Sequence, residues 1–529
     1  MIQDWQSLSL KEQIAQMIIV RASGHLFDHQ IRYPAWEANN QQLKTWLREL
    51  NLGGVILLGG SSVELQVRSQ QLQSWANIPL FIAADIEEGI GQRFSGGTWF
   101  PPPMALGKIY EQNPDLARQY AYQMGEVTAE EALAVGINWL LAPVVDVNNN
   151  PDNPAINIRA FGDRPEVVAD LTTAFIQGAK STAILTTAKH FPGHGDTSTD
   201  SHLDLPALNH SESRLATVEL PPFEQAIATG VDSVMTAHLL IAAWDAKLPV
   251  TLSQKIVTEI LRNRLGFSGL VVTDALIMGG ITKYATPEIV AVMAVEAGTD
   301  ILLMPDNPEV AIASIYDAVQ TGRIKQSRIQ ESLARIWQAK QQVFADSTTI
   351  TELSSDRARS TVNSILKNSL QQSKTSIITD PHAPGRNLIV VDDLLTANYL
   401  DINSPAITIP QEYNYQRQLV DGNTLDCILL DSRPTLLQVF IRGNPFRGNA
   451  GLTNKTKAIY QQLITNQQVA GIAIYGSPYV LEWFKSIMGS DLPWVFTYGQ
   501  MPQAQAIALK TLFTDNSQPL EFQSHNFGF

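Results

Sequence analysis

A short segment, residues 189–206, concentrates the side chains that could carry acid–base chemistry. It reads KHFPGHGDTSTDSHLDLP and contains three of the nine histidines, His190, His194 and His202. Two glycines and a proline near its start predict a shaped loop rather than a helix. Asp200 lies two residues before His202, close enough for its carboxylate to orient the imidazole. Such a partner favours the charged imidazolium, which is the form that a general acid needs.

The same histidines allow two other interpretations. His190, His194 and His202 could bind a metal ion, although their spacing is not that of a helical ligand pair and no acidic motif completes a known zinc pattern. The segment could also be a structural loop with hydrogen-bonded histidines, and His194 and His210 are candidates for that role. The chemistry therefore depends on the elements that position these residues.

Eight short apolar runs in the first 340 residues predict a parallel sheet. Each is apolar at consecutive positions, as expected for strands buried on both faces, and helical patterns lie between most of them. Eight such units over roughly 300 residues favour a closed (β/α)8 barrel over an open, doubly wound sheet. The runs are 16–20, 54–58, 80–84, 139–143, 183–187, 233–236, 270–273 and 301–304.

Polar residues follow these runs repeatedly, and barrel active sites lie at the carboxyl ends of the strands. We expect Lys189 and His190 to stand at a strand end and to donate hydrogen bonds into the site. His238 either lines the site or packs in the core. The residues after the third to eighth runs are Asp85 and Glu87, Asp146, Lys189 and His190, His238, Asp274, and Asp306.

A second group of apolar runs predicts a separate domain. The runs 387–391, 427–430, 437–441, 471–475 and 494–498 alternate with helical patterns, which is typical of a three-layer α/β sandwich. The expected organisation is a catalytic barrel over 1–340, a helical linker over 341–385 and an α/β domain over 386–529. No P-loop or dinucleotide fingerprint is found, so a nucleotide site is not expected.

Length and charge exclude several classes of protein. A chain of 529 residues is expected to form two or three domains. Its 37 basic and 51 acidic residues give a net charge of −14, which disfavours nucleic-acid binding. The single cysteine, Cys427, lies in an apolar run and is interpreted as a core residue, so neither a disulfide within the chain nor a cysteine-rich metal site is expected.

The hydropathy of the chain also bears on its location. No apolar run approaches the roughly 20 residues needed to span a bilayer. The N-terminus is polar from its third residue and shows no secretory signal. A cytoplasmic protein without a membrane span is therefore expected.

The 189–206 string resembles the signature of glycoside hydrolase family 3, and specifically its β-N-acetylglucosaminidase branch, whose loop carries KHFPGHG followed by Asp-Ser-His. Three more segments resemble family motifs in the right order: DIEEGIGQR at 85–93, NIRAFG at 157–162 and TDALIM at 273–278. Glu88 and Gly91 depart from the first of these, D-x-E-G-G-x-V-x-R. The local backbone is therefore expected to differ, and Glu87 is given no direct role.

The resemblance implies a retaining exo-β-N-acetylhexosaminidase that removes terminal β-linked N-acetylglucosamine. Asp274 is then the nucleophile that forms a covalent glycosyl-enzyme, and His202, oriented by Asp200, replaces the second carboxylate of the usual template. Because these two lie on a loop, the pair is expected to be complete when that loop closes. The residues implied in sugar binding are Asp85, Arg93, Arg159, Lys189 and His190.

The implied substrate is a disaccharide or muropeptide containing N-acetylglucosamine, from peptidoglycan turnover in a bacterium. Neither a metal nor an organic cofactor is expected. A β-glucosidase or a β-glycoside phosphorylase on the same barrel remains an alternative, because a histidine does not repel phosphate as a second carboxylate would. A metal-dependent hydrolase that uses the histidine cluster and a non-catalytic sugar-binding protein are the others.

Overall fold

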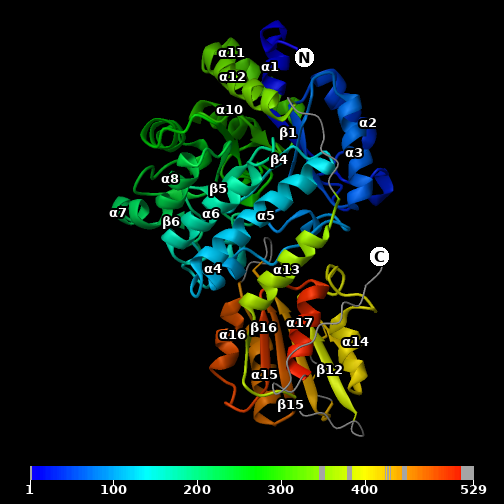
Figure 1. Ribbon diagram of the computed structural model, residues 1–529. Coiled ribbons are helices and arrows are strands. Elements are labelled where there is room, and N and C mark those ends of the chain that lie inside the picture. The colour runs from blue at the N-terminus through cyan, green and yellow to red at the C-terminus, as the bar shows by residue number, and fades with distance from the viewer. Residues whose placement is uncertain are drawn as a thin grey trace. The chain divides into compact units, whose positions relative to one another are not determined.

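The computed structural model describes residues 3–344, 352–377, 384–422, 424–425, 428, 431–443 and 450–513. The chain divides into two compact units (Figure 1). One comprises residues 1–365 and 443–450, and the other comprises 366–442 and 451–529. Each unit has its own sheets and its own core.

The first unit is a closed barrel of eight parallel strands. One sheet has the order β10 (Leu302–Leu303), β1 (Ile18–Ser23), β2 (Gly54–Leu58), β3 (Phe81–Ala84) and β4 (Trp139–Leu140). The other has the order β5 (Thr187–Phe191), β7 (Ser233–Thr236) and β9 (Leu270–Thr273). Parallel bridges between Trp139 and Leu185 and between Val272 and Ile301 join the two sheets at both sides. The strand order returns to its start, which confirms the predicted (β/α)8 barrel.

Helices connect the strands around the barrel, and two further short strands, β6 (Ala207–Leu208) and β8 (Leu240–Ile241), pair outside it. The helices of this unit are α1 (Leu10–Ala15), α2 (Asn40–Thr45), α3 (Ser62–Trp75), α4 (Met104–Tyr110), α5 (Pro114–Ala134), α6 (Pro165–Ala179), α7 (Glu212–Arg214), α8 (Leu220–Ala228), α9 (Gly279–Thr282), α10 (Pro287–Ala297), α11 (Pro308–Gln320) and α12 (Gln326–Val343). Helix α13 (Asp356–Ser369) follows them and contains residues of both units. An additional helical segment spans Lys255–Arg264.

Local sequence explains where the longer helices begin and end. The Asn113 side chain accepts the N–H of Leu116, and Pro114 supplies the first helical residue of α5, where its missing N–H costs nothing. Asn307 and Pro308 do the same for α11. Helix α10 ends at Gly298, whose φ of 118° is one that glycine adopts without steric penalty.

All eight predicted strands overlap an observed strand, but the fifth is displaced and shares only Thr187 with it. The apolar run 183–187 predicts the strand four residues too early, because β5 spans Thr187–Phe191. Lys189 and His190 therefore lie within the strand and not after it. Both are buried there, because carboxylates from neighbouring strand ends compensate the charge of Lys189 and bond to the ring of His190.

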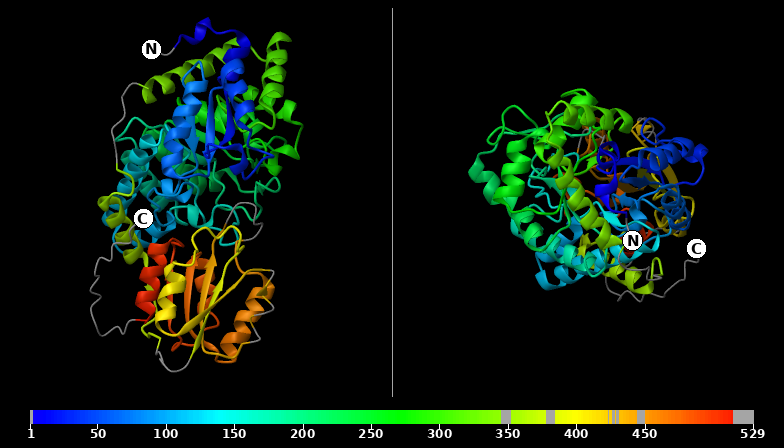
Figure 2. Two further views of the ribbon diagram at one scale, coloured as in Figure 1. Left: turned by 90° about the vertical axis from the view of Figure 1, so that its right-hand side faces the viewer. Right: turned by 90° about the horizontal axis from the view of Figure 1, so that it is seen from above.

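The second unit is the predicted three-layer α/β sandwich. Its sheet has the order β11 (Gln371–Gln372), β16 (Trp494–Thr497), β15 (Val469–Gly476), β14 (Thr435–Ile441), β12 (Gly385–Val390) and β13 (Tyr415–Val420), with only β11 antiparallel among these described strands. Helices α14 (Pro405–Glu412) and α17 (Pro502–Phe513) pack together on one face. Helices α15 (Asn454–Thr465) and α16 (Pro478–Lys485) cover the other face (Figure 2), where the rings of Tyr460 and Phe484 stack.

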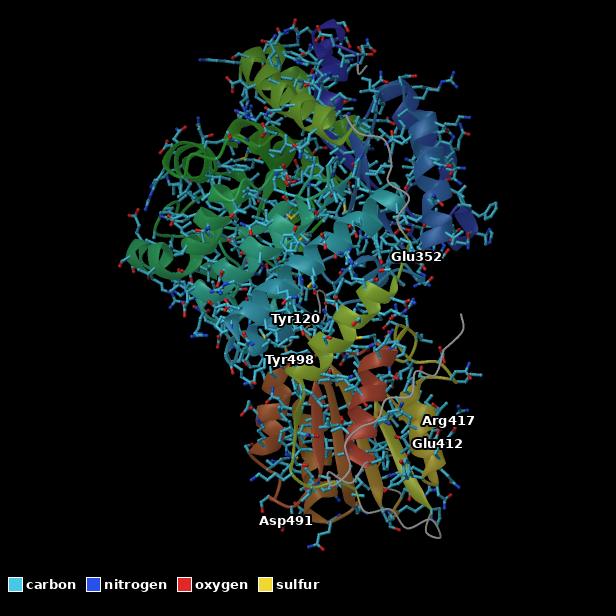
Figure 3. All side chains as sticks on the ribbon, in the orientation of Figure 1. Tyr120, Glu352, Glu412, Arg417, Asp491 and Tyr498 are labelled. Carbon is cyan, nitrogen blue, oxygen red and sulfur yellow. The ribbon has the colours of Figure 1, made fainter. Side chains whose placement is uncertain are left out.

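Two differences from the expected second unit concern its sheet. The sequence does not predict β13, whose Gln416 and Arg417 are exposed (Figure 3 labels Arg417). Polar residues of this kind are typical of an edge strand, because they discourage pairing with other chains. The strand predicted at 427–430, including Cys427, falls mostly on positions outside the described residues. Among the residues that are described, no helix is long and apolar enough to cross a bilayer.

Candidate active site

Asp274 directly follows β9, the seventh strand of the barrel. Its backbone N–H donates to the carbonyl of Thr236 at the end of β7, at 3.1 Å, which fixes the residue at the carboxyl end of the barrel. Burial by itself raises the pKa of Asp274, but electrostatic interactions with nearby histidines, His190 foremost, outweigh burial and hold that pKa below its usual value. Asp274 is therefore a partly buried carboxylate that is ionised at neutral pH.

The structure brings Asp200 and His202 together as a pair. Asp200 Oδ1 accepts hydrogen bonds from His202 Nδ1 at 2.8 Å and from the His202 backbone N–H at 2.9 Å. The Asp200 side chain is 1% exposed and that of His202 is 20% exposed. Because a carboxylate can only accept, Nδ1 carries the proton, and the ring is held in one orientation. The pair is already formed in this structure.

Lys189 and Arg159 meet at a carboxylate to which the sequence assigned no role. Glu87 Oε1 lies 2.6 Å from Lys189 Nζ and 2.8 Å from Arg159 Nη2, and Glu87 Oε2 accepts from Arg159 Nε at 2.9 Å. Asp85 Oδ1 lies 2.8 Å from the same lysine nitrogen. Burial raises the pKa of Glu87, but Arg159 and Lys189 outweigh it and lower that pKa well below the usual range. The buried Lys189, the partly buried Arg159 and two carboxylates thus balance each other.

Arg93 lies apart from this cluster. Its side chain is exposed, and Nε donates to the backbone carbonyl of Asp85 at 3.1 Å. The neighbouring departure from the family motif, Glu88, is fully buried and accepts the indole N–H of Trp99 at 3.0 Å. The segment 85–93 therefore keeps Asp85 and Arg93 in contact while it accommodates the extra carboxylate.

Asp146 organises two of the three histidines of the loop. One carboxylate oxygen lies 2.8 Å from His190 Nδ1, and the other accepts the backbone N–H groups of His190 at 3.1 Å and His194 at 2.7 Å. The His194 ring is bonded on both nitrogens, to Thr197 Oγ1 and to Ser201 Oγ, each at 2.8 Å. Burial lowers the pKa of His194 to about 4, so its ring is neutral. The imidazole rings of the three histidines therefore bond to different side chains and do not point at a common ligand position.

Two further residues support the site. His238 is buried and bonded to Thr251 Oγ1 at 2.8 Å and to the carbonyl of Ala275, next to Asp274, at 3.1 Å. Burial lowers the pKa of His238, so it acts as a neutral brace. Asn153, also buried, donates to the carbonyls of His194 and Gly195 at 2.8 and 3.0 Å, which ties the loop before Arg159 to the loop after β5.

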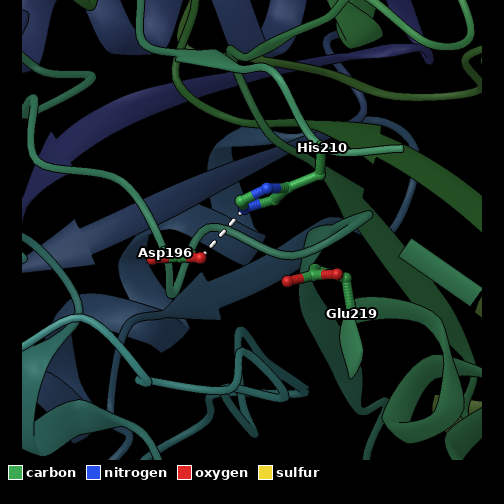
Figure 4. Close-up of side chains that lie close together, drawn as sticks. All are labelled: Asp196, His210 and Glu219. Atoms are coloured by element: carbon green, nitrogen blue, oxygen red, sulfur yellow. Dashed lines mark ion pairs between the residues drawn. The ribbon is translucent and has the colours of Figure 1, made fainter. Parts of the chain in front are cut away.

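A separate cluster lies further along the loop after β5. Asp196, His210 and Glu219 form the one group, in the part of the chain that the structure describes, in which three potential metal-ligand atoms lie within 4.8 Å of one another (Figure 4). Arg214 Nη2, however, lies 3.1 Å from Asp196 and 3.3 Å from Glu219. Since a guanidinium already sits between the two carboxylates, we interpret this cluster as an ion-pair network that stabilises the loop.

Comparison with known proteins identifies the family. Residues 9–339 match the glycosyl hydrolase family 3 N terminal domain, and residues 379–514 match the bacterial glycosyl hydrolase family 3 C-terminal domain. This chain belongs to glycosyl hydrolase family 3. The family resemblance of the four sequence motifs is thereby confirmed.

Individual relatives of this family 3 chain extend the comparison. β-Hexosaminidase A of Pseudoalteromonas piscicida is 34% identical in an alignment of 330 residues, and the match covers 56% of this chain but only 55% of that protein. A β-hexosaminidase of Nitrosomonas eutropha is 34% identical over 53% of this chain and 83% of its own length. A family 3 β-N-acetylglucosaminidase structure from Paenibacillus sp. str. FPU-7 has a TM-score of 0.80 and 28% identity over 96% of this chain and 97% of its own. A β-glucoside phosphorylase with 20% identity and a TM-score of 0.79 shares the fold.

Proposed function

We propose that this family 3 protein is a retaining exo-β-N-acetylhexosaminidase that releases terminal β-linked N-acetylglucosamine. The observation that supports this proposal most directly is the ionised Asp274 at the end of β9. The Asp200–His202 pair lies on a loop that is hydrogen-bonded to the segment that follows Asp274. The β-hexosaminidases among its relatives and the Paenibacillus β-N-acetylglucosaminidase support the class of substrate.

In the first step, an oxygen of Asp274 attacks the anomeric carbon of the terminal sugar, and the bond from that carbon to the leaving oxygen breaks. His202 gives its Nε2 proton to the leaving oxygen, because Nδ1 is engaged by Asp200. The products are a glycosyl ester on Asp274 and the released second part of the substrate.

In the second step, the neutral His202 removes a proton from water at the same nitrogen. The water oxygen attacks the anomeric carbon, and the bond to Asp274 breaks, which restores the carboxylate. Two inversions at one carbon give net retention of configuration. Asp200 stabilises the imidazolium that exists before the first step and after the second.

The charged cluster is proposed to bind the sugar. Asp85 has a side chain that is 37% exposed, while Lys189 behind it is 1% exposed and fixed by Asp85 and Glu87. Charged donors and acceptors that are held rigidly form strong hydrogen bonds to hydroxyl groups once water is excluded. Lys189, His190, Arg159 and Arg93 complete the proposed set, with Glu87 as the residue that positions Lys189 and Arg159.

The source of the substrate is proposed to be peptidoglycan, as a disaccharide or muropeptide that contains N-acetylglucosamine. This part rests on the family resemblance, and the cytoplasmic location stays a prediction. A β-glucosidase or β-glycoside phosphorylase is the second candidate, because a histidine in place of a second carboxylate lets phosphate approach the anomeric carbon.

A panel of chromogenic β-glycosides tests the proposal. We expect cleavage of the N-acetylglucosaminide to exceed that of the glucoside and xyloside at equal concentration. Equal or faster cleavage of the glucoside contradicts the proposal and favours a β-glucosidase. The same reactions with added inorganic phosphate separate the acceptors, because a phosphorylase yields a sugar 1-phosphate, whereas the hydrolase yields only free sugar.

A further inference from the structure

The turn that carries the proposed acid/base pair is bonded to the segment that follows the proposed nucleophile. The backbone N–H groups of Gly279 and Gly280 donate to the carbonyls of His202 and Ser201, at 3.0 Å each. These glycines are the first two residues of α9, where N–H groups have no acceptor within the helix. The turn supplies both acceptors. The two donor glycines lie five and six residues after Asp274.

Close approach explains why glycine stands at both positions. A Cβ on Gly279 would lie 2.7 Å from the carbonyl oxygen of Leu203, and a Cβ on Gly280 would lie 2.8 Å from that of Ser201. Both distances are too short for a carbon beside a backbone oxygen. Neither glycine has a left-handed φ, so the space between the segments, and not the backbone conformation, excludes a side chain.

The other side of the turn is held by the loop after β5. Ser201 Oγ lies 2.8 Å from His194 Nε2, and the His194 backbone N–H donates to Asp146 at 2.7 Å. The turn is thus held by hydrogen bonds on two sides, to the loop after β5 and to the start of α9. Its contact with α9 is the one that leads directly back along the chain to Asp274.

We propose that Gly279 and Gly280 are positioning residues that set the place of the His202 imidazole relative to Asp274. This inference rests on the proposed function of His202 as the proton donor. Through this placement the two glycines affect proton transfer to the leaving oxygen. They do not affect recognition of the terminal sugar, because the cluster around Lys189 performs that recognition.

The variants Gly279→Ala and Gly280→Ala test this with two substrates. One is a disaccharide with a poor leaving group, and the other is a dinitrophenyl glycoside whose leaving group departs with little proton assistance. General acid catalysis contributes about 10²–10⁴-fold, so we expect each variant to slow glycosylation by the disaccharide about 10- to 100-fold. The same step with the dinitrophenyl glycoside should change far less. Gly489→Ala is the matched control, because Gly489 has open space around its Cβ position and no left-handed φ.

A double variant separates positioning from general damage to the fold. In a His202→Ala background, Gly280→Ala should cause little further loss, because the group through which the glycine acts is already absent. Losses that multiply in the double variant, or an equal loss for both substrates in the single variant, would overturn the proposal. If neither glycine variant folds, Ser201→Ala is measured in the same way. It removes the bond to His194 without adding volume, and an equal loss for both substrates overturns the proposal there too.

The failure of this inference is distinguishable from failure of the proposed function. If His202→Ala itself leaves the dependence on the leaving group unchanged, the acid role of His202 is wrong. If His202→Ala changes that dependence and the glycine variants do not, only the positioning role of the glycines is wrong.

Discussion

Arg159 and Glu87 are joined by two hydrogen bonds, Nη2 to Oε1 at 2.8 Å and Nε to Oε2 at 2.9 Å, although 72 residues separate them in the chain. Lys189 shares Oε1 of the same carboxylate at 2.6 Å. Glu87 is therefore the counter-ion of two cations, the buried Lys189 and the partly buried Arg159, that the sugar-binding proposal requires to be charged and fixed.

Glu87→Gln is expected to destabilise the barrel and to abolish most of the activity. Removal of one partner from a buried ion pair typically costs about 3–5 kcal/mol, because the remaining charge stays buried without compensation. The free energy of unfolding, measured by denaturant titration, checks this. Glu111→Gln is the control, since Glu111 pairs with Lys108 at the surface, where a pair contributes at most about 1 kcal/mol. Similar stability of the two variants would contradict the role given to Glu87.

Asp274→Ala and Asp274→Asn are expected to lower turnover by several orders of magnitude while the chain stays folded. Loss of the nucleophile removes the covalent route altogether, and no neighbouring group replaces it. Turnover is measured on purified variants whose circular dichroism matches that of the wild type. Substantial activity in a folded variant that is free of contaminating enzyme would exclude Asp274 as the nucleophile.

His202→Ala is expected to slow substrates with poor leaving groups most, because a good leaving group needs little proton assistance. Water activation is lost as well, so the glycosyl-enzyme should accumulate and give a burst, and azide, which needs no general base, should restore turnover. Asp200→Ala should show a milder form of this pattern. Glycosylation rates for a series of aryl glycosides provide the check. If the slope of the glycosylation rate against leaving-group pKa equals that of the wild type, His202 is not the acid, and the loop has a binding or structural role.

Lys340 is expected to make stability depend on pH at the other end of the barrel from the site. It is buried in α12, where Nζ donates to Gln16 Oε1 at 2.7 Å and to the carbonyl of Pro79 at 2.6 Å. Burial lowers the pKa of Lys340 to about 7, from its ordinary value of 10.5. Below about pH 7 the folded state carries a buried charge, and above 10.5 neither state is charged, so the penalty fades as pH rises between these values.

The stability difference between wild type and Lys340→Met measures this effect. It should shift in favour of the wild type as pH rises from about 7 to 10, by at most about 1.4 kcal/mol per pH unit. Lys283→Met, at a side chain that is 63% exposed, should give a difference that does not change with pH. A constant difference for Lys340→Met as well would contradict a neutral buried lysine.

The sequence predicts the barrel because most of its strands are uniformly apolar. It predicts the fifth strand poorly because that strand contains Lys189 and His190. Lys189 and His190 look like residues of a loop until their partners are known. Those partners, Asp85 and Asp146, lie 104 and 44 residues away. Burial of polar residues depends on contacts between distant segments, which periodicity within a short window does not contain. The edge strand β13 is missed for a related reason, since only two of its six residues are buried.

In the candidate site too, contacts between residues close in sequence are predicted and contacts between distant residues are not. Asp200 and His202 are close in sequence, so their contact follows from spacing alone, and the structure shows it. The sequence places Glu87 and Asp146 at strand ends but gives them no role, and it misses Asn153, because each acts on residues more than 40 positions away. Arg93 keeps its sequence spacing to Asp85 but remains outside the buried cluster. The repeated polar residues after apolar runs are the signal that marked Asp146, without showing which residues it bonds.

The pairing of the chain's early and late strands also fixes an order of events during synthesis. Strand β1 cannot gain its second neighbour until Leu302 and Leu303 have been made, and β11 finds its partner only when β16 emerges. At roughly 5–20 residues per second, the ribosome needs on the order of ten seconds or more to pass from α12 to α17. The barrel can therefore close around its proposed catalytic residues while the sandwich is still an incomplete nascent chain.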